Sequence, residues 1–316
     1  MSRTTIAALI FALLLPVAVN AQLNGHNSRG DFGLQSGTQA PPGFYVVPLL
    51  YDYRADTLRD RSGDRRPARP GGGEIEVQAG IVGLLWTSET KVFGGTYGVE
   101  IWPGVTNNAL EAPFLGVDSS TSNGLADLYV RPVSLGWNTD RADFIAGLGF
   151  YAPTGDWELG GDSNRGLGMW GYEIFGGTTV YFDEAHTWHL SALASYEMHD
   201  KKEDTNIRVG DVLTIEGGLG KSFMDGALAV GVAYYAQWKV TKDDLGLSFS
   251  TPNAPLSNKH RVYGFGPEVM LPIASKSTLF GFLTLRYLWE TGARSTLEGN
   301  TFVALLSFPV PSIPLQ

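Results

Sequence analysis

Apolar and polar side chains alternate along Thr187–Met198, which reads T-W-H-L-S-A-L-A-S-Y-E-M. Trp188 and Leu190 fall on one face of an extended chain, whereas His189 and Glu197 fall on the other. This period of two is typical of a β-strand with one apolar and one polar face. A strand that crosses a bilayer needs about 9–11 residues and favours aromatic residues near its ends. The stretch therefore predicts one strand of a transmembrane barrel.

Eleven other stretches fit this template, and together they predict an antiparallel barrel of about twelve strands. The predicted strands are Phe44–Ala55, Gly73–Trp86, Lys91–Pro103, Gly124–Trp137, Asp143–Pro153, Leu167–Phe182, Thr187–His199, Asp211–Phe223, Ala227–Thr241, Arg261–Leu271, Thr278–Glu290 and Thr301–Phe308. The alternation is clear on Ala227–Thr241, where Tyr235, Gln237 and Lys239 share one face. It is poor on Gly73–Trp86 and Asp143–Pro153, where small residues share faces with bulky ones.

The predicted connections alternate between long and short. Long connections such as Asp56–Gly72, Gly104–Asn123 and Lys242–His260 are separated by short ones such as Asp183–His186, and the last, Thr291–Asn300, is intermediate. Outer-membrane barrels have short periplasmic turns and longer extracellular loops. We therefore predict an all-β transmembrane barrel over residues 44–308, with both ends of its wall on the short-turn side. A soluble β-sandwich also alternates but rarely sorts its connections by length.

The two ends of the chain differ from the strands. Residues 1–21 contain Arg3, the apolar run Ile6–Leu15 and a small-residue site at Ala21, which predicts a cleaved secretory signal. The run is shorter than the roughly 17–25 residues of a spanning anchor, the alternative. Residues 22–43 are aperiodic and rich in Gly and Pro, so they form either a plug in the lumen or a disordered periplasmic leader. Residues 309–316 form a Pro-rich tail.

Composition narrows the classes of function. The chain has no cysteine, 40 glycines and a net charge of −9. Disulfides and thiolate metal sites are therefore excluded, and the lack of a basic cluster argues against nucleic acid as a partner. We expect no cofactor and no metal. The expected partners are outer-membrane lipid, lipopolysaccharide, the barrel-assembly machinery and small solutes of a Gram-negative bacterium.

Ionisable residues on the predicted strands are expected to line the lumen, because a charge on the lipid face costs roughly 2–4 kcal/mol at the midplane for Arg or Lys. On Phe44–Ala55 the pattern predicts that Tyr51 and Tyr53 face outward and that Asp52 and Arg54 face inward. The lumen-lining candidates are Asp52, Arg54, Glu100, Asp127, Arg131, Glu173, Glu197, Glu216, Lys239, Glu268, Arg286 and Glu290. They form either a hydrated path that favours cations or a salt-bridged network that fills the interior.

Two other sets of residues suggest chemistry. His186 and His189 lie near Ser191 and Ser195, as in a lipid hydrolase, but residues two apart on a strand are roughly 6–7 Å apart and no G-x-S-x-G element is present. The acidic pairs in 200–204 and 243–244 are possible Ca²⁺ ligands, with solvated loop charge as the simpler interpretation. We therefore predict that the protein is not an enzyme.

Three stretches carry a family resemblance: G-D-F-G-L-Q-S-G-T-Q-A-P-P-G-F-Y at Gly30–Tyr45, G-L-A-D-L-Y-V-R-P-V-S-L-G-W at Gly124–Trp137 and Y-A-P-T-G-D-W at Tyr151–Trp157. They resemble the family named for the MetA gene of phenol meta-cleavage pathways. The resemblance implies an outer-membrane barrel that passes or senses hydrophobic or aromatic compounds, and it brings no catalytic residues. One departure is that Phe308, expected as a terminal aromatic residue, is followed by P-V-P-S-I-P-L-Q.

Overall fold

The structure is a computed structural model that describes residues 23–65, 74–112, 117–159, 164–246, 259–311 and 313–314. The predicted signal over residues 1–21 lies outside the described residues. The strands are β1 (Gly43–Leu58), β2 (Glu74–Val92), β3 (Gly95–Trp102), β4 (Gly104–Ala112), β5 (Val117–Ser120), β6 (Gly124–Leu125), β7 (Leu128–Asn138), β8 (Ala142–Ala152), β9 (Gly171–Tyr181), β10 (Trp188–His199), β11 (Val212–Phe223), β12 (Leu228–Lys239), β13 (Arg261–Ala274), β14 (Thr278–Arg294), β15 (Leu297–Val310) and β16 (Ile313–Pro314).

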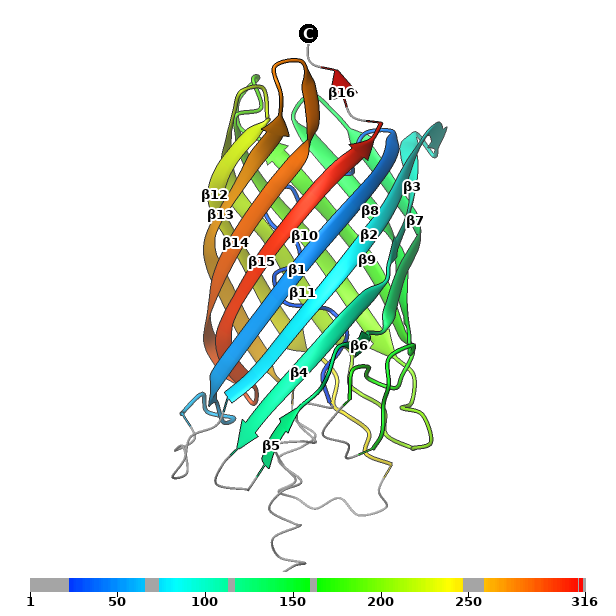
Figure 1. Cartoon of the computed structure of the whole chain (residues 1–316), viewed down its shortest axis with the longest axis vertical. Coiled ribbons are helices and arrows are strands. Elements are labelled where there is room, and N and C mark those ends of the chain that lie inside the picture. The colour runs from blue at the N-terminus through cyan, green and yellow to red at the C-terminus, as the bar shows by residue number, and fades with distance from the viewer. Residues whose placement is uncertain are drawn as a thin grey trace, which may run out of the picture.

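Twelve of these strands form a closed antiparallel barrel, shown in Figure 1. Each wall strand pairs with its neighbour, in the order β1, β15 down to β7, β3 and β2, and the pairing of β1 with β2 closes the ring. The predicted twelve-stranded barrel is therefore confirmed. The strands tilt across the wall, as closure of a sheet into a barrel requires. Within the described residues, no helix is long and apolar enough to cross a membrane.

The connections sort by length, with one exception. The expected intermediate loop at Thr291–Asn300 is wrong, because β14 continues to Arg294 and β15 begins at Leu297, which leaves a two-residue turn. Ser295 lies in the left-handed region at φ 54°, and such conformations allow tight hairpin turns. The turn expected at Thr87–Thr90 also lies inside β2, and the chain reverses instead at Phe93 and Gly94, both of which have positive φ.

The segment after β3 was predicted to be a loop, Gly104–Asn123, but it contains strand structure. Beyond Pro103, β4 continues alongside β2, with Ile81 opposite Gly104 and Glu74 opposite Glu111. On its other edge, β4 pairs with the short strands β5 and β6, whereas β3, which precedes Pro103, pairs with β7. Proline lacks the N–H that a ladder needs, so the pairing partner changes at this residue. Figure 1 shows β4 diverging from β7 toward the long-loop end.

The outer surface of the barrel is apolar and has aromatic residues near both ends. Trp86 and Trp188 are 47% and 46% exposed near the short-turn end, and Trp170 and Trp289 are comparably exposed near the long-loop end. Two such girdles mark the interfaces of a membrane barrel. The predicted faces of Thr187–His199 and Ala227–Thr241 are correct, since the polar face of each is buried and the apolar face is exposed.

The predicted faces of β1 are wrong. Tyr53 points inward and donates a hydrogen bond to Glu290, whereas Asp52 and Arg54 lie on the outer face. Arg54, whose side chain is 54% exposed, pairs with Asp52 and with Glu76 on β2. These charges lie toward the long-loop ends of β1 and β2, which at 16 and 19 residues exceed the about 9–11 needed to span a bilayer. The outer face beyond the apolar belt can carry charge. On this part of β1, alternation alone therefore does not show which face points into the barrel.

Candidate functional site

Residues 23–42 run through the lumen as an irregular chain, which is called here the N-terminal segment. Leu23 packs against Met169 and Val209 at the long-loop end. At the other end, Thr38 donates to Asp143 beside the short turns, shortly before β1 begins. The segment therefore spans the interior from one end to the other, as the blue trace inside the barrel in Figure 1 shows. The described part of the segment therefore begins at the long-loop end and leads to β1 at the short-turn end.

Carboxylates of the barrel wall bind the backbone of the N-terminal segment. Glu197 on β10, Glu216 on β11 and Glu268 on β13 accept hydrogen bonds from five backbone amides at 2.6–3.3 Å. The amides belong to His26, Asn27, Gly30, Phe32 and Leu34. Irregular backbone at membrane depth needs such internal partners, because few waters replace them. The three wall glutamates therefore hold the segment in an extended, non-helical path.

Cations complete this network from both sides. Arg29 of the segment donates to Glu290 at 3.0 Å, and Arg286 on β14 donates to Glu268 at 2.7 Å. The Arg286 guanidinium also donates to the Gly30 carbonyl, and Lys239 to the Leu23 carbonyl. Backbone amides and backbone carbonyls of the segment are thus both hydrogen-bonded to side chains of the wall. The segment is therefore part of the packed interior.

Arg131 on β7 is the centre of a second cluster. Its guanidinium pairs with Glu100 at 3.1 Å and lies 3.9 Å from the centre of the Phe175 ring. Phe32 of the segment approaches the same guanidinium, at 5.5 Å. Glu173 accepts from the Tyr129 hydroxyl and from Asn27. A buried guanidinium is thus paired with a carboxylate and covered by aromatic rings, as such a group requires.

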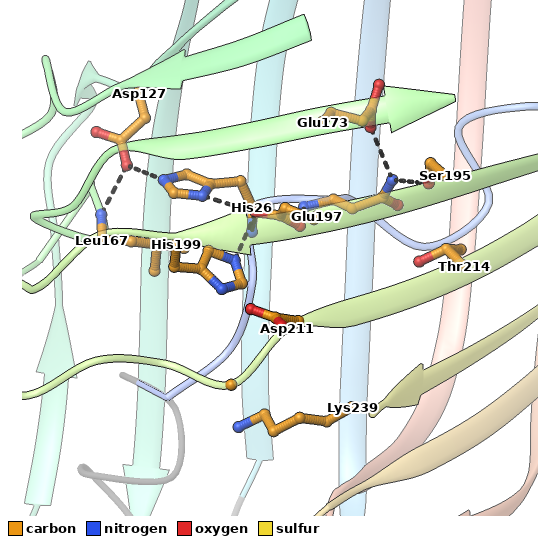
Figure 2. A network of polar contacts seen from close by, with 12 residues as sticks. His26, Asp127, Leu167, Glu173, Ser195, Glu197, His199, Asp211, Thr214 and Lys239 are labelled. Atoms are coloured by element: carbon orange, nitrogen blue, oxygen red, sulfur yellow. Dashed lines mark hydrogen bonds and ion pairs between the residues drawn. The ribbon is translucent and has the colours of Figure 1, made fainter. Parts of the chain in front are cut away.

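Figure 2 shows the network around His26, near the start of the segment. The His26 Nδ1 atom lies 2.9 Å from Glu197 Oε1, and its Nε2 atom lies 3.4 Å from Asp127 Oδ2. The His199 Nε2 atom lies 2.8 Å from the same Glu197 oxygen. The His26 ring also stacks on Tyr151, with 4.7 Å between ring centres. Two imidazoles therefore meet one buried carboxylate.

The structure brings most of the twelve candidates together and separates two. Nine of them contact the N-terminal segment, and Glu100 joins them through Arg131. Asp52 and Arg54 lie apart on the outer face. Sequence reasoning missed His26, Asn27 and Arg29, which belong to an aperiodic stretch. The predicted inward-facing residues contain more acids than bases, and buried carboxylates need hydrogen-bond donors. This imbalance could have indicated that another part of the chain enters the lumen to supply donors.

Gly37 marks the closest approach between the segment and the wall. A Cβ atom at this position would overlap the backbone of Thr178 on β9. We expect Gly37→Ala to lower the free energy of unfolding by about 1–3 kcal/mol, the usual cost of overpacking. Urea unfolding in lipid vesicles measures this change. The control is Gly176→Ala on the same strand as Thr178, where a Cβ atom would lie 3.7 Å from its nearest neighbour; equal stability of the two variants would contradict the expected packing.

A cavity of about 680 Å³ lies between the segment and the wall. One side is apolar and is formed by inward side chains of β1 and β2, and the other side carries polar groups and aromatic rings. The apolar lining residues are Val47, Leu49, Ile75, Val77, Ala79 and Ile81, and the facing ones include His26, Arg29, Asp31, Tyr129 and Trp157. This size and this mixture are typical of sites for small organic molecules.

Loop residues cover the long-loop end of the cavity. Lys202 donates to the Leu167 carbonyl and lies 5.3 Å from the centre of the Trp157 ring. Burial lowers the pKa of the Lys202 ammonium to about 8. Asp243, one of the suggested Ca²⁺ ligands, is also buried and pairs with Lys239 at 2.8 Å. Charged groups at this end therefore bind one another and the loop backbone.

The serines and histidines of β10 do not form a hydrolase pair. The Ser191 hydroxyl donates to the Gly33 carbonyl, and the Ser195 hydroxyl accepts from Asn27. His189 Nε2 is buried without a hydrogen-bond partner among the described residues. Both hydroxyls are therefore hydrogen-bonded to the N-terminal segment.

Comparison with known proteins identifies a family and solved outer-membrane barrels of similar fold. A family model described as "Putative MetA-pathway of phenol degradation" matches residues 55–306. The COG4313 outer membrane channel from Pseudomonas putida F1 is 11% identical, with a TM-score of 0.70 over 90% of this chain and 99% of that one. The β domain of the Bordetella autotransporter BrkA is 13% identical, with a TM-score of 0.45 over 84% and 99%. No curated protein sequence matches the chain.

Proposed function

Because the chain belongs to the MetA-pathway phenol-degradation family, we propose that it is an outer-membrane channel for passive uptake of small hydrophobic or aromatic compounds. The observation that carries the proposal is the cavity beside the N-terminal segment, which is apolar along β1 and β2. A solute with an aromatic body fits against that side, while any polar substituent meets the segment. Passage needs no covalent chemistry, so the protein acts as a non-enzymatic channel.

The N-terminal segment acts as a plug in this proposal. The segment is hydrogen-bonded to Glu197, Glu216 and Glu268 and occupies the polar side of the lumen. With twelve strands, the barrel is intermediate in diameter between eight-stranded barrels, which side chains fill, and 16–18-stranded porins, which hold an open channel. In a barrel of this diameter, a segment in the lumen determines how wide the path is. The plug leaves the apolar side accessible and restricts ions and hydrophilic solutes.

The proposed location is the outer membrane, reached after cleavage of the signal over residues 1–21. The apolar belt and the two aromatic girdles support contact with lipid, and the long loops face lipopolysaccharide outside. The barrel-assembly machinery is the proposed partner for insertion. The last wall strand, β15, extends to Val310, and β16 pairs with the start of β14, so Pro309, Val310, Ile313 and Pro314 of the predicted tail belong to strands.

Ala79→Phe on β2 tests the apolar path, because Ala79 lines the cavity. We expect the larger side chain to lower, several-fold, the initial rate at which cells take up radiolabelled toluene. The matched control is Val82→Phe on the same strand, since Val82 is 41% exposed on the lipid-facing side. Uptake should stay unchanged in the control.

The second candidate is a structural or ligand-binding barrel whose interior network fills the lumen. The buried pairs of Arg286 with Glu268 and of Arg29 with Glu290 favour it. This candidate requires that cells with and without the barrel take up toluene at the same rate. Equal rates would therefore reject the channel.

A further inference from the structure

Glu197 and His199 form an E-x-H pair near the end of β10. Residues two apart on a strand share a face, so both side chains point into the barrel. Both are buried, at 1% exposure each. His26 of the N-terminal segment meets them from the opposite side, as Figure 2 shows. Three residues from two separate parts of the chain thus converge at one point.

The three side chains offer ligand atoms at metal-site spacing. One atom from each of His26, Glu197 and His199 lies within 4.8 Å of the other two. The two imidazole nitrogens are 2.9 and 2.8 Å from Glu197 Oε1. Ligand atoms around a tetrahedral Zn²⁺, with bonds of about 2.0–2.2 Å, lie about 3.4 Å apart. Each nitrogen would therefore move about half an ångström away from Glu197 Oε1, and the two nitrogens, which lie within 4.8 Å of each other, would move closer together by up to about 1.4 Å.

The surroundings are built for histidine ligands. Asp127 lies on the far side of the His26 ring, beside Nε2, and its carboxylate is held by the amides of Gly155 and Leu167. A carboxylate on the second nitrogen of a histidine is the usual partner of a metal-bound imidazole, because it fixes the tautomer and the ring orientation. His199 Nδ1, also buried, has no hydrogen-bond partner among the described residues.

Two glycines leave room for the cluster. A Cβ atom at Gly25 would lie 2.7 Å from Glu197 Oε2, and one at Gly171 would lie 2.7 Å from His26 Nδ1. The backbone of the segment and that of β9 therefore approach the ligand atoms as closely as only glycine allows. Because His26 also lines the cavity, an ion can reach the cluster from that side.

We propose that His26, Glu197 and His199 bind one divalent transition-metal ion of the Zn²⁺ class. Two imidazole nitrogens and one carboxylate oxygen suit this class, whereas Ca²⁺ and Mg²⁺ take oxygen ligands. Three protein ligands leave a fourth position for water. The bound ion joins the N-terminal segment to β10, and this role does not depend on what passes through the barrel.

The test uses the full folded chain in detergent after treatment with EDTA. The protein is dialysed against ZnCl₂, desalted and analysed for zinc by mass spectrometry, and the affinity is measured by competition with a chelating dye. We expect one zinc per chain in the wild type and loss of binding in His26→Ala and in His199→Gln. Asp127→Asn should keep the site but weaken it by about 10–100-fold, as outer-sphere substitutions do.

His189→Ala is the matched control, because His189 is a buried histidine on the same face of β10, and its Nε2 atom has no hydrogen-bond partner in the part of the chain that the structure describes. It should bind zinc as the wild type does. Zinc should also slow amide hydrogen exchange over residues 25–30 in the wild type and leave it unchanged in His199→Gln. Heat-modifiable gel mobility verifies that each variant is folded. Wild-type protein without zinc, equal binding in all variants, or unchanged exchange would overturn the proposal.

Discussion

Deleting residues 23–42 should raise the single-channel conductance of the barrel severalfold in planar lipid bilayers. The segment occupies the polar half of the lumen through its bonds to Glu197, Glu216 and Glu268. Without it, these carboxylates and Arg286 face an interior that water fills, because unpaired buried charges are strongly unfavourable. Ions then find a continuous aqueous path lined by a net negative charge.

A second variant covers the case in which the shortened chain folds poorly. Glu216→Gln keeps the segment and the Arg286–Glu268 pair but removes the charge that holds Gly30 and Phe32. We expect intermittent openings to the conductance of the deletion variant. Folding of both variants is verified by the faster migration of unboiled protein in gels. A folded deletion variant with wild-type conductance would show that the segment does not restrict the path.

Arg286→Ala should lower the free energy of unfolding by several kcal/mol, about 3–5. Arg286 and Glu268 are each 5% exposed at the side chain, and the Arg286 guanidinium also binds the Gly30 carbonyl. Removing one partner of a buried ion pair leaves an uncompensated charge, which costs about 3–5 kcal/mol. Urea unfolding in lipid vesicles, followed by tryptophan fluorescence, measures the change.

The control for this prediction is Arg54→Ala. Arg54 also pairs with two carboxylates, those of Asp52 and Glu76, but its side chain is 54% exposed on the outer face. Exposed pairs contribute little, because water and salt screen them. The unfolding midpoint of this variant should match that of the wild type. Similar losses in both variants would contradict the inward and outward placement of the two arginines.

The wall of the barrel could be predicted from the sequence because most of its strands follow a local rule. Alternation on Thr187–His199 and Ala227–Thr241 reflects one face in lipid and one in the lumen, and the structure confirms both. The rule failed on Phe44–Ala55, where the strand outgrows the membrane and charges such as Arg54 lie outside. It also failed after Pro103, because the pairing of β4 with β2 depends on a neighbour and not on the residues of β4 itself.

The interior could be predicted only in part. The acidic residues of the inner faces were found because charge on the lipid face is costly, but their partners were not. His26 and Arg29 belong to a stretch with no period, and its path is fixed by bonds to residues more than 170 positions away, such as Glu197 and Glu290. Long-range bonds of this kind leave no local pattern. Glu197 was among the predicted lumen residues, whereas His26 and His199 were not.

The path of the N-terminal segment also constrains the order of events during folding. The wall closes where β1 meets β15, the first and last strands of the ring, so closure waits for the C-terminal end of the chain. Residues 23–42 must then be enclosed before the seam forms, since drawing them through a finished ring would expose Glu216 and Glu268 unpaired. We therefore expect the strands to curl around the segment as around a template. The part of the chain that is synthesised first is thus enclosed by the part that is synthesised last.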